Sequence, residues 1–197
     1  MLEGPNMAFP LIENDDERAF RREASARIQE TRALWQWFVA TRRLQLVDAP
    51  NGLPAFAGAV ESTKVSVAAV GSVEHGFRTR AWADAKIPMR GRVAVRPPGD
   101  WDDLVAQLKE RHYFGDPELD RWLVVKTSSK GLAHVVLDAR VLQTVRALAP
   151  GRLELSYEDG AIELTWAGVE RNFAILDDVL AVVAYLAVQG GELSPYR

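Results

Sequence analysis

Two stretches of the chain share one order of patterns: two segments of alternating polarity joined by a turn, then a helical segment. The first stretch covers residues 77–111 and the second covers residues 152–187. From Phe77 to Ile87, apolar, small or β-branched residues take every second position, and mostly charged residues take the others. Such alternation is typical of a strand with one buried face. The shared order predicts two hairpin–helix units and hints at an internal pseudo-repeat.

Other segments add strands to this scheme. Residues 56–60 and 64–70 are separated by a short turn and predict a further hairpin. Residues 121–127 are apolar on both sides, as expected of a central strand. Asp159-Gly160 is a strongly favoured two-residue hairpin turn and joins the two strands of the second unit.

Helical spacing predicts a long N-terminal helix over residues 15–42, starting at a capping box made by Asn14 and Glu17. The first half of this helix is highly charged, so we expect it to need another part of the fold to pack against. The apolar stripe of this helix consists of Phe20, Ala24, Ile28, Trp35 and Phe38. Further helices are predicted over residues 100–111, 132–137, 139–149 and from Asn172 to about residue 188.

The order of these elements predicts an α+β fold: a largely antiparallel sheet of about seven strands with four or five helices on one face. Residues 1–14 are interpreted as a disordered or expression-derived leader. Residues 15–197 are expected to form a single domain, within which residues 15–114 and 115–197 are candidate subdomains.

Composition narrows the classes of function. The chain has 197 residues, a formal net charge of −3 and no cysteine. The lack of cysteine excludes disulfides, thiolate metal sites and cysteine nucleophiles. The net negative charge argues against general nucleic-acid binding. No apolar run reaches the roughly 18–20 residues of a membrane span, so we expect a soluble bacterial protein of the cytoplasm.

The middle of the chain resembles a family of uncharacterised bacterial proteins. Its motifs are a Gly115-Asp116-Pro117 turn with Asp120 ahead of a strand, a Leu137-Asp138-x-x-Val141 run and a Glu158-Asp159-Gly160 turn. The resemblance covers about residues 44–188, and similar chains often carry membrane-spanning helices beside this domain. No activity is attached to that family, so the resemblance assigns no role to any residue.

The most unusual charge pattern lies in the predicted hairpin of the first unit, residues 78–96. Strand parity places most of its basic side chains on one face, together with Trp82. Guanidinium groups beside an aromatic ring suit a phosphate, a carboxylate-rich partner or an anionic membrane surface. The opposing interpretation is a solvated face neutralised by acidic residues at 13–17 or 100–103. The basic residues are Arg78, Arg80, Lys86, Arg90, Arg92 and Arg96.

Other polar residues favour structural roles over chemistry. The three histidines, His75, His112 and His134, share no ligand-like spacing, so neither a metal site nor a catalytic pair is predicted. Asp116 and Asp120 are interpreted as turn residues rather than paired catalytic carboxylates. Residues 126–131 resemble a phosphate loop only faintly and predict a strand-to-helix turn with a serine cap.

These observations favour a non-catalytic protein-binding or scaffold module whose partner is unidentified. Self-association is an open alternative, with Trp37 on the long helix and Trp82 as candidate interface residues. The second hypothesis is binding of an anionic ligand or membrane surface through residues 78–96. An enzyme with an unrecognised composite site is the third. No catalytic residue, cofactor or metal is predicted.

Overall fold

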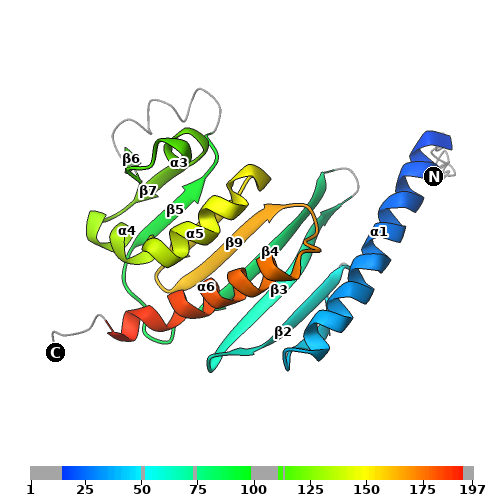
Figure 1. Ribbon diagram of the computed structural model, residues 1–197, viewed down its shortest axis with the longest axis horizontal. Helices are drawn as coiled ribbons and strands as arrows, with labels where there is room; N and C mark the ends of the chain where they lie inside the picture. The colour runs from blue at the N-terminus through cyan, green and yellow to red at the C-terminus, as the bar shows by residue number, and fades with distance from the viewer. Residues whose placement is uncertain (1–14, 50–51, 73–74, 99–110, 113, 193–197) are drawn as a thin grey trace, which may run out of the picture.

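One antiparallel sheet forms the centre of the structure. The computed structural model describes residues 15–49, 52–72, 75–98, 111–112 and 114–192. Within them, nine strands follow the order β1-β2-β3-β4-β9-β8-β5-β7-β6, and all neighbouring strands are antiparallel (Figure 1). The strands are β1 (Gln45–Asp48), β2 (Pro54–Val60), β3 (Thr63–Ser72), β4 (Gly76–Asp84), β5 (Arg92–Arg96), β6 (Arg111–His112), β7 (Val124–Thr127), β8 (Glu154–Glu158) and β9 (Ala161–Ala167).

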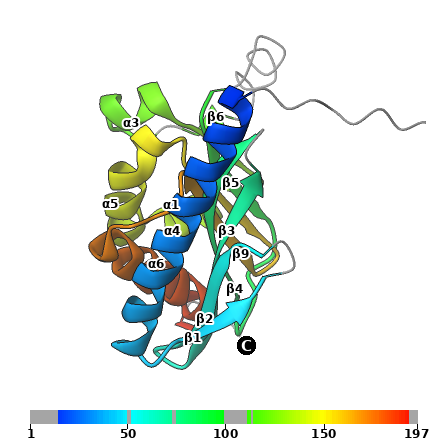
Figure 2. The ribbon, with the colours of Figure 1, turned by 90° about the vertical axis from the view of Figure 1, so that its right-hand side faces the viewer.

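Helices cover one face of this sheet, and none of the described helices lies on the other (Figure 2). The predicted α+β class is therefore confirmed. The sheet has more strands than the seven expected, because β1 and β6 span only four and two residues and show no periodic pattern. The helices are α1 (Asp15–Ala40), α3 (Pro117–Trp122), α4 (Lys130–Val136), α5 (Ala139–Leu148) and α6 (Phe173–Glu192), with a 3₁₀ turn, η1 (Ala149–Gly151).

The core lies between the sheet and these helices. The apolar stripe of α6 runs over β3, β4 and β9, where alternate strand residues such as Val67, Ala81 and Leu164 are buried. Trp35 and Phe38 of α1 pack on Phe56 of β2, with ring centroids 5.1 and 5.5 Å away. The second half of α1 is thus part of the core, while its first half extends past the sheet (Figure 1).

Residues 78–96 do not form the predicted hairpin. The β8–β9 hairpin inserts between β4 and β5, so that β4 pairs with β9 and β5 pairs with β8. The connection from β4 to β5 passes across the tip of this hairpin. There, Ala85 N–H donates to the Gly160 carbonyl at 2.7 Å, and Asp159 N–H donates to the Gly91 carbonyl at 3.0 Å. The prediction of an internal pseudo-repeat is therefore wrong. The two candidate subdomains, residues 15–114 and 115–197, both contribute strands to one sheet.

The structure places residues 117–122 in the helix α3, whereas the sequence predicts a strand over 121–127. Asp116 caps α3 by accepting from Glu118 N–H and Leu119 N–H, and Pro117 occupies the first turn. The strand β7 starts only at Val124. Proline at the first helical position and a preceding aspartate are favourable helix starts, and they outweigh the apolar run that follows.

Several local predictions are confirmed. Ser129 caps α4, Asp138 caps α5, and the Asn172 side chain accepts from Ala174 N–H at 3.0 Å where α6 begins. The turn between β2 and β3 has positive φ at Glu61 and Ser62, as a tight hairpin turn requires. The leader, the predicted Asn14–Glu17 capping box and the Phe20 side chain lie outside the described residues and side chains. So do residues 100–110 of the predicted helix over 100–111, while Arg111 belongs to the strand β6.

Candidate functional site

The uncovered face of the sheet carries the basic strand residues. Arg78 and Arg80 of β4 lie on it with Trp82, and Arg92 and Arg96 of β5 lie on the same face. The parity prediction is correct for these residues. Because β8 and β9 separate the two strands, however, the arginines form two rows with an acidic strip between them instead of one basic patch.

Glutamates of the inserted hairpin pair with the first row. Arg78 contacts Glu154 at 3.0 Å, and Arg80 contacts Glu163 at 2.5 Å. These glutamates are far away in sequence and were not among the predicted neutralising residues. Both ion pairs are partly exposed, and such pairs contribute about 0–1 kcal/mol each. They nevertheless remove much of the positive field that this face would present to an anion.

The remaining basic residues of the segment lie in the β4–β5 connection. The Lys86 ammonium donates to Ser62 Oγ at 2.8 Å, and the Arg90 side chain is exposed. Lys86 and Arg90 therefore lie outside the two arginine rows, which are on the strands β4 and β5. Trp82 is half-buried and lies below Arg80, whose guanidinium carbon is 5.3 Å from the ring centroid.

A cleft of about 920 Å³ opens at one end of the sheet, where β4 begins and β5 ends. We call it the basic cleft. In Figure 1 this end is the upper edge, between α3 and the start of β4. Its polar lining consists of Arg78, Arg96, Arg121, Arg152, His75 and Glu154. Its apolar lining includes Phe77, Trp122, Ala149 and three prolines.

Arg121 and Arg152 were not predicted as site residues. Arg121 sits in the last turn of α3 and is exposed, with its guanidinium carbon 5.8 Å from the Trp122 ring centroid. Arg152 directly follows η1 and has a left-handed backbone with φ of 53°. No periodic pattern marks either residue in the sequence, since a short helix and a 3₁₀ turn position them.

Asp116 anchors the α3 wall of the basic cleft. Its carboxylate caps α3 and also pairs with Arg146 of α5. The hydrogen bond from Arg146, assisted by the backbone N–H groups of Glu118 and Leu119, lowers the pKa of Asp116 below its ordinary value. Asp120 accepts from Phe114 N–H at 2.8 Å. The two aspartates thus hold the backbone, as predicted, and do not form a carboxylate pair.

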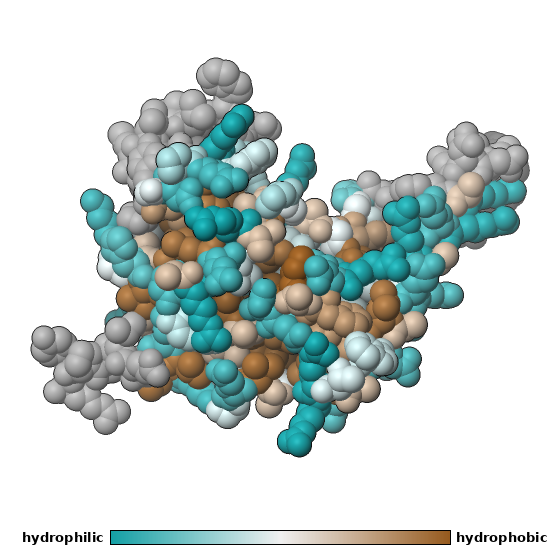
Figure 3. All heavy atoms as spheres, viewed as in Figure 1, coloured by the Kyte–Doolittle hydropathy of each residue, from teal (hydrophilic) through white to brown (hydrophobic). Residues whose placement is uncertain are grey.

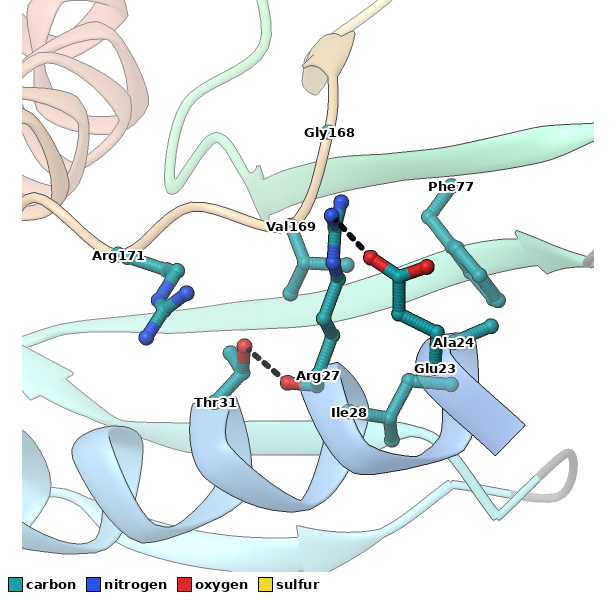
Figure 4. Close-up of a pocket in the computed structure, with 9 residues that line it drawn as sticks. All are labelled: Glu23, Ala24, Arg27, Ile28, Thr31, Phe77, Gly168, Val169 and Arg171. Atoms are coloured by element: carbon teal, nitrogen blue, oxygen red, sulfur yellow. Dashed lines mark hydrogen bonds and ion pairs between the residues drawn. The ribbon is translucent and has the colours of Figure 1, made fainter. Parts of the chain in front are cut away.

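A second cavity, of about 460 Å³, lies under the middle of α1 (Figure 4). Ala24 and Ile28 form its helix wall, and Phe77 and Val169 form the opposite wall. Figure 4 shows Arg27 and Glu23 across its mouth, joined by an ion pair of 2.6 Å. We call this cavity the α1 groove.

Trp37 lies on α1 beyond the α1 groove. It is 60% exposed, although its ring stacks on Phe173 with centroids 5.3 Å apart. A shallow depression beside it is lined by Leu34 and Arg171, and Arg171 also lines the α1 groove. The two features therefore form one continuous surface along α1, which we call the α1 surface.

The remaining candidate residues do not come together in one site. His75 lies at the basic cleft and His134 on α4, while the His112 side chain is outside the described ones. Within the described part of the chain, no three His, Asp or Glu side chains are placed to hold a metal ion. Residues 126–131 form the expected strand-to-helix turn, in which Ser129 Oγ accepts from Leu132 N–H. None of the helices in the described segments is both long and apolar enough to cross a membrane.

These features define an α+β domain built on a nine-stranded antiparallel sheet with one helical face. No family model and no curated protein matches the sequence. Among solved structures, the chain is similar to the crystal structure of the mycobacterial trehalose monomycolate transport factor A, TtfA. The TM-score is 0.56 at 12% sequence identity, over 85% of this chain and 98% of that one. At this identity the likeness shows a shared fold.

Proposed function

We propose that this protein is a non-catalytic protein-binding module that acts through the α1 surface. The partner would be a protein segment with apolar side chains along one side, either in another protein or in a second copy of this chain. Such a segment would cover Trp37 and place its apolar side chains in the α1 groove. We also propose that this chain is related to the uncharacterised bacterial family that has the Gly-Asp-Pro turn.

The exposure of Trp37 carries the proposal. An indole that is 60% exposed but stacked on Phe173 is held in one orientation before any partner arrives. Tryptophan is enriched among the residues that dominate the binding energy of protein interfaces. Preorganisation also lowers the entropic cost of binding, because little side-chain freedom remains to be lost.

The surroundings of Trp37 fit the same role. The α1 groove continues the apolar surface beyond it, and charged side chains such as Arg27, Glu30 and Arg171 surround this surface. Arg171 pairs with Glu30 at 3.2 Å across the two features. An apolar centre with a polar rim is the usual composition of a protein interface. Figure 3 shows the outer half of α1 as a mostly hydrophilic arm, which is consistent with such a rim.

Replacing Trp37 tests the proposal. Trp37→Ala should lower partner affinity by about tenfold or more, because truncating a central aromatic anchor typically costs about 2 kcal/mol or more. The measurement is copurification of the tagged full chain from a bacterial host, followed by titration of the recovered partner. Sedimentation of the purified chain tests whether the partner is a second copy.

Gln36→Ala is the matched control. Gln36 is the exposed neighbour of Trp37 on the same helix and lines neither cavity. The control should bind like the unmodified chain. Equal binding by Trp37→Ala and the unmodified chain, with both proteins folded, would contradict the α1 surface as the interface.

The second candidate function is binding of an anionic ligand or membrane surface through residues 78–96. One observation favours it: Arg78 and Arg96, from the two ends of this segment, line the same cleft. The ion pairs with Glu154 and Glu163 weaken the case for the sheet face itself. Binding by either region should weaken as salt is added, because exposed charges are screened.

A further inference from the structure

We propose that the basic cleft binds a phosphate group, with Arg121 and Arg152 as its principal contacts. The inference rests on the second candidate function. It moves the site from the predicted hairpin face to the end of the sheet and brings in two arginines outside residues 78–96. A phosphorylated soluble molecule and the headgroup of an anionic lipid present the same chemistry.

Four separate elements bring the arginines together. Arg78 comes from the start of β4, Arg96 from the end of β5, Arg121 from α3 and Arg152 from the residue after η1. Arg78 also donates to the Arg152 carbonyl at 3.3 Å, which ties two of the walls directly. Arginines contributed by separate elements can contact different oxygens of one phosphate, and each guanidinium can bind two oxygens in a fork geometry.

The charge balance of the cleft favours an anion with more than one negative charge. Its described lining holds four arginines and one carboxylate, Glu154. Glu154 is already paired with Arg78. Among the described residues, Arg121 and Arg152 have no carboxylate within ion-pair distance. A phosphate monoester carries about −1.5 to −2 at neutral pH, whereas a carboxylate carries only one charge.

The backbone conformation of Arg152 also agrees with a binding role for this residue. Its φ of 53° is left-handed, a conformation in which glycine is favoured at helix ends. An arginine at such a position is less favourable for folding than a glycine. The basic cleft gives this arginine a role that glycine could not fill.

The α3 wall is held in place independently of any ligand. The Asp116 cap and its pair with Arg146 fix α3 against α5. Next to Arg121, Trp122 is 53% exposed and lines the cleft with Pro97 and Pro150. These apolar surfaces would pack against a ring or alkyl body attached to the phosphate, since an aromatic face accommodates either.

The position of Arg152 supplies a clean test. Arg152→Gly removes the guanidinium and relieves the left-handed backbone, so the variant should fold at least as well as the unmodified chain. Arg121→Gln removes the second guanidinium and keeps a good helix former in α3. Arg90→Gln and Arg92→Gln remove the same charge outside the cleft and serve as matched controls.

Binding is measured by calorimetry with inorganic pyrophosphate, and by sedimentation with phosphatidylcholine vesicles that do or do not contain phosphatidic acid. Both assays use low ionic strength, about 0.01 M, where screening is weak. Arg152→Gly and Arg121→Gln should each weaken binding by about tenfold or more, because hydrogen bonds to charged groups are strong. The two controls should bind like the unmodified chain. Binding of pyrophosphate indicates a soluble ligand, and binding of phosphatidic acid vesicles alone indicates a headgroup.

The outcomes separate this inference from the function on which it rests. If the control variants lose binding and the cleft variants keep it, the basic segment binds anions through the sheet face and the cleft assignment is overturned. If the unmodified chain binds neither probe, both fail. Loss of binding in Arg152→Gly with an unchanged melting temperature supports the basic cleft specifically.

Discussion

Asp116 shows how one side chain can do two structural jobs. Its carboxylate caps α3 through two backbone N–H groups and pairs with Arg146, which lies on α5. The helix cap is a local interaction, whereas the ion pair joins two elements that are far apart in the sequence. Since α3 carries Arg121 and Trp122, this residue also sets one wall of the basic cleft.

The lowered pKa of Asp116 predicts a pH dependence of stability. A carboxylate with a depressed pKa in the folded state stabilises the fold above its unfolded pKa, about 3.9, and this contribution is lost as the pH falls through the folded pKa. Asp116→Asn keeps a good cap but cannot ionise. The variant should therefore be less stable than the unmodified chain at about pH 6, and the difference should be smaller at about pH 3. Urea unfolding at both pH values measures the difference, and a pH-independent difference would contradict the role of the Arg146 pair.

At the residue scale, sequence reasoning succeeds where the interaction is local. The caps Ser129, Asp138 and Asn172 are predictable because each side chain bonds a backbone group within a few residues. The partner of Arg80 is not, because Glu163 lies 83 positions away. Nothing in a single sequence indicates which distant glutamate will face a given arginine.

At the element scale, the insertion of the β8–β9 hairpin decides the arrangement of the sheet. The connection between β4 and β5 crosses the hairpin tip, and a Cβ built on Gly160 would lie 2.5 Å from Pro88 Cβ. Gly160 has φ of +97° and is buried. The crossing therefore needs a residue with no side chain at this point.

Gly160→Ala should destabilise the fold more than Gly168→Ala. Both glycines have positive φ, at +97° and +84°, so both variants incur a backbone penalty of about 1–2 kcal/mol. Only Gly160 has a close neighbour, whereas Gly168 has none within 4 Å. The overpacking should add about 1–3 kcal/mol to the loss for Gly160→Ala. Denaturant unfolding compares the two, and equal losses would argue against the crossing.

Alternating polarity identifies strands, but it does not identify their neighbours. Residues 77–87 and 92–96 have the pattern of a hairpin, and the four residues between them, 88–91, are an ordinary length for a hairpin loop. The β8–β9 hairpin, with its two-residue Asp159-Gly160 turn, is the stronger local unit and is confirmed. The pairing of β4 with β9 and of β5 with β8 follows from long-range packing of buried faces, which periodicity does not encode.

At the scale of the whole molecule, helices bury one face of the sheet, and two candidate binding surfaces, both lined by Phe77, remain exposed. The α1 surface is apolar with a charged rim, and the basic cleft at the end of the sheet is rich in arginine. The predicted interface residue Trp37 lies on the first, and Arg78 and Arg96 line the second. Trp82 lies on the open sheet face, away from both. The sequence predicts an exposed tryptophan on α1, but the cleft appears only after folding places α3 and η1 beside the ends of β4 and β5.

The most direct test of the central claim, that the α1 surface is a protein interface, is photo-crosslinking in bacterial cells. A photoreactive amino acid is placed at Ala33, which is exposed and lines the depression beside Trp37. A second version carries it at Gln143, which is exposed on α5 and lines neither binding surface. We predict a discrete crosslinked species from Ala33 that is lost in Trp37→Ala, and no such species from Gln143. Equal crosslinking from both positions, or a species at Ala33 unaffected by Trp37→Ala, would contradict the α1 surface as the interface.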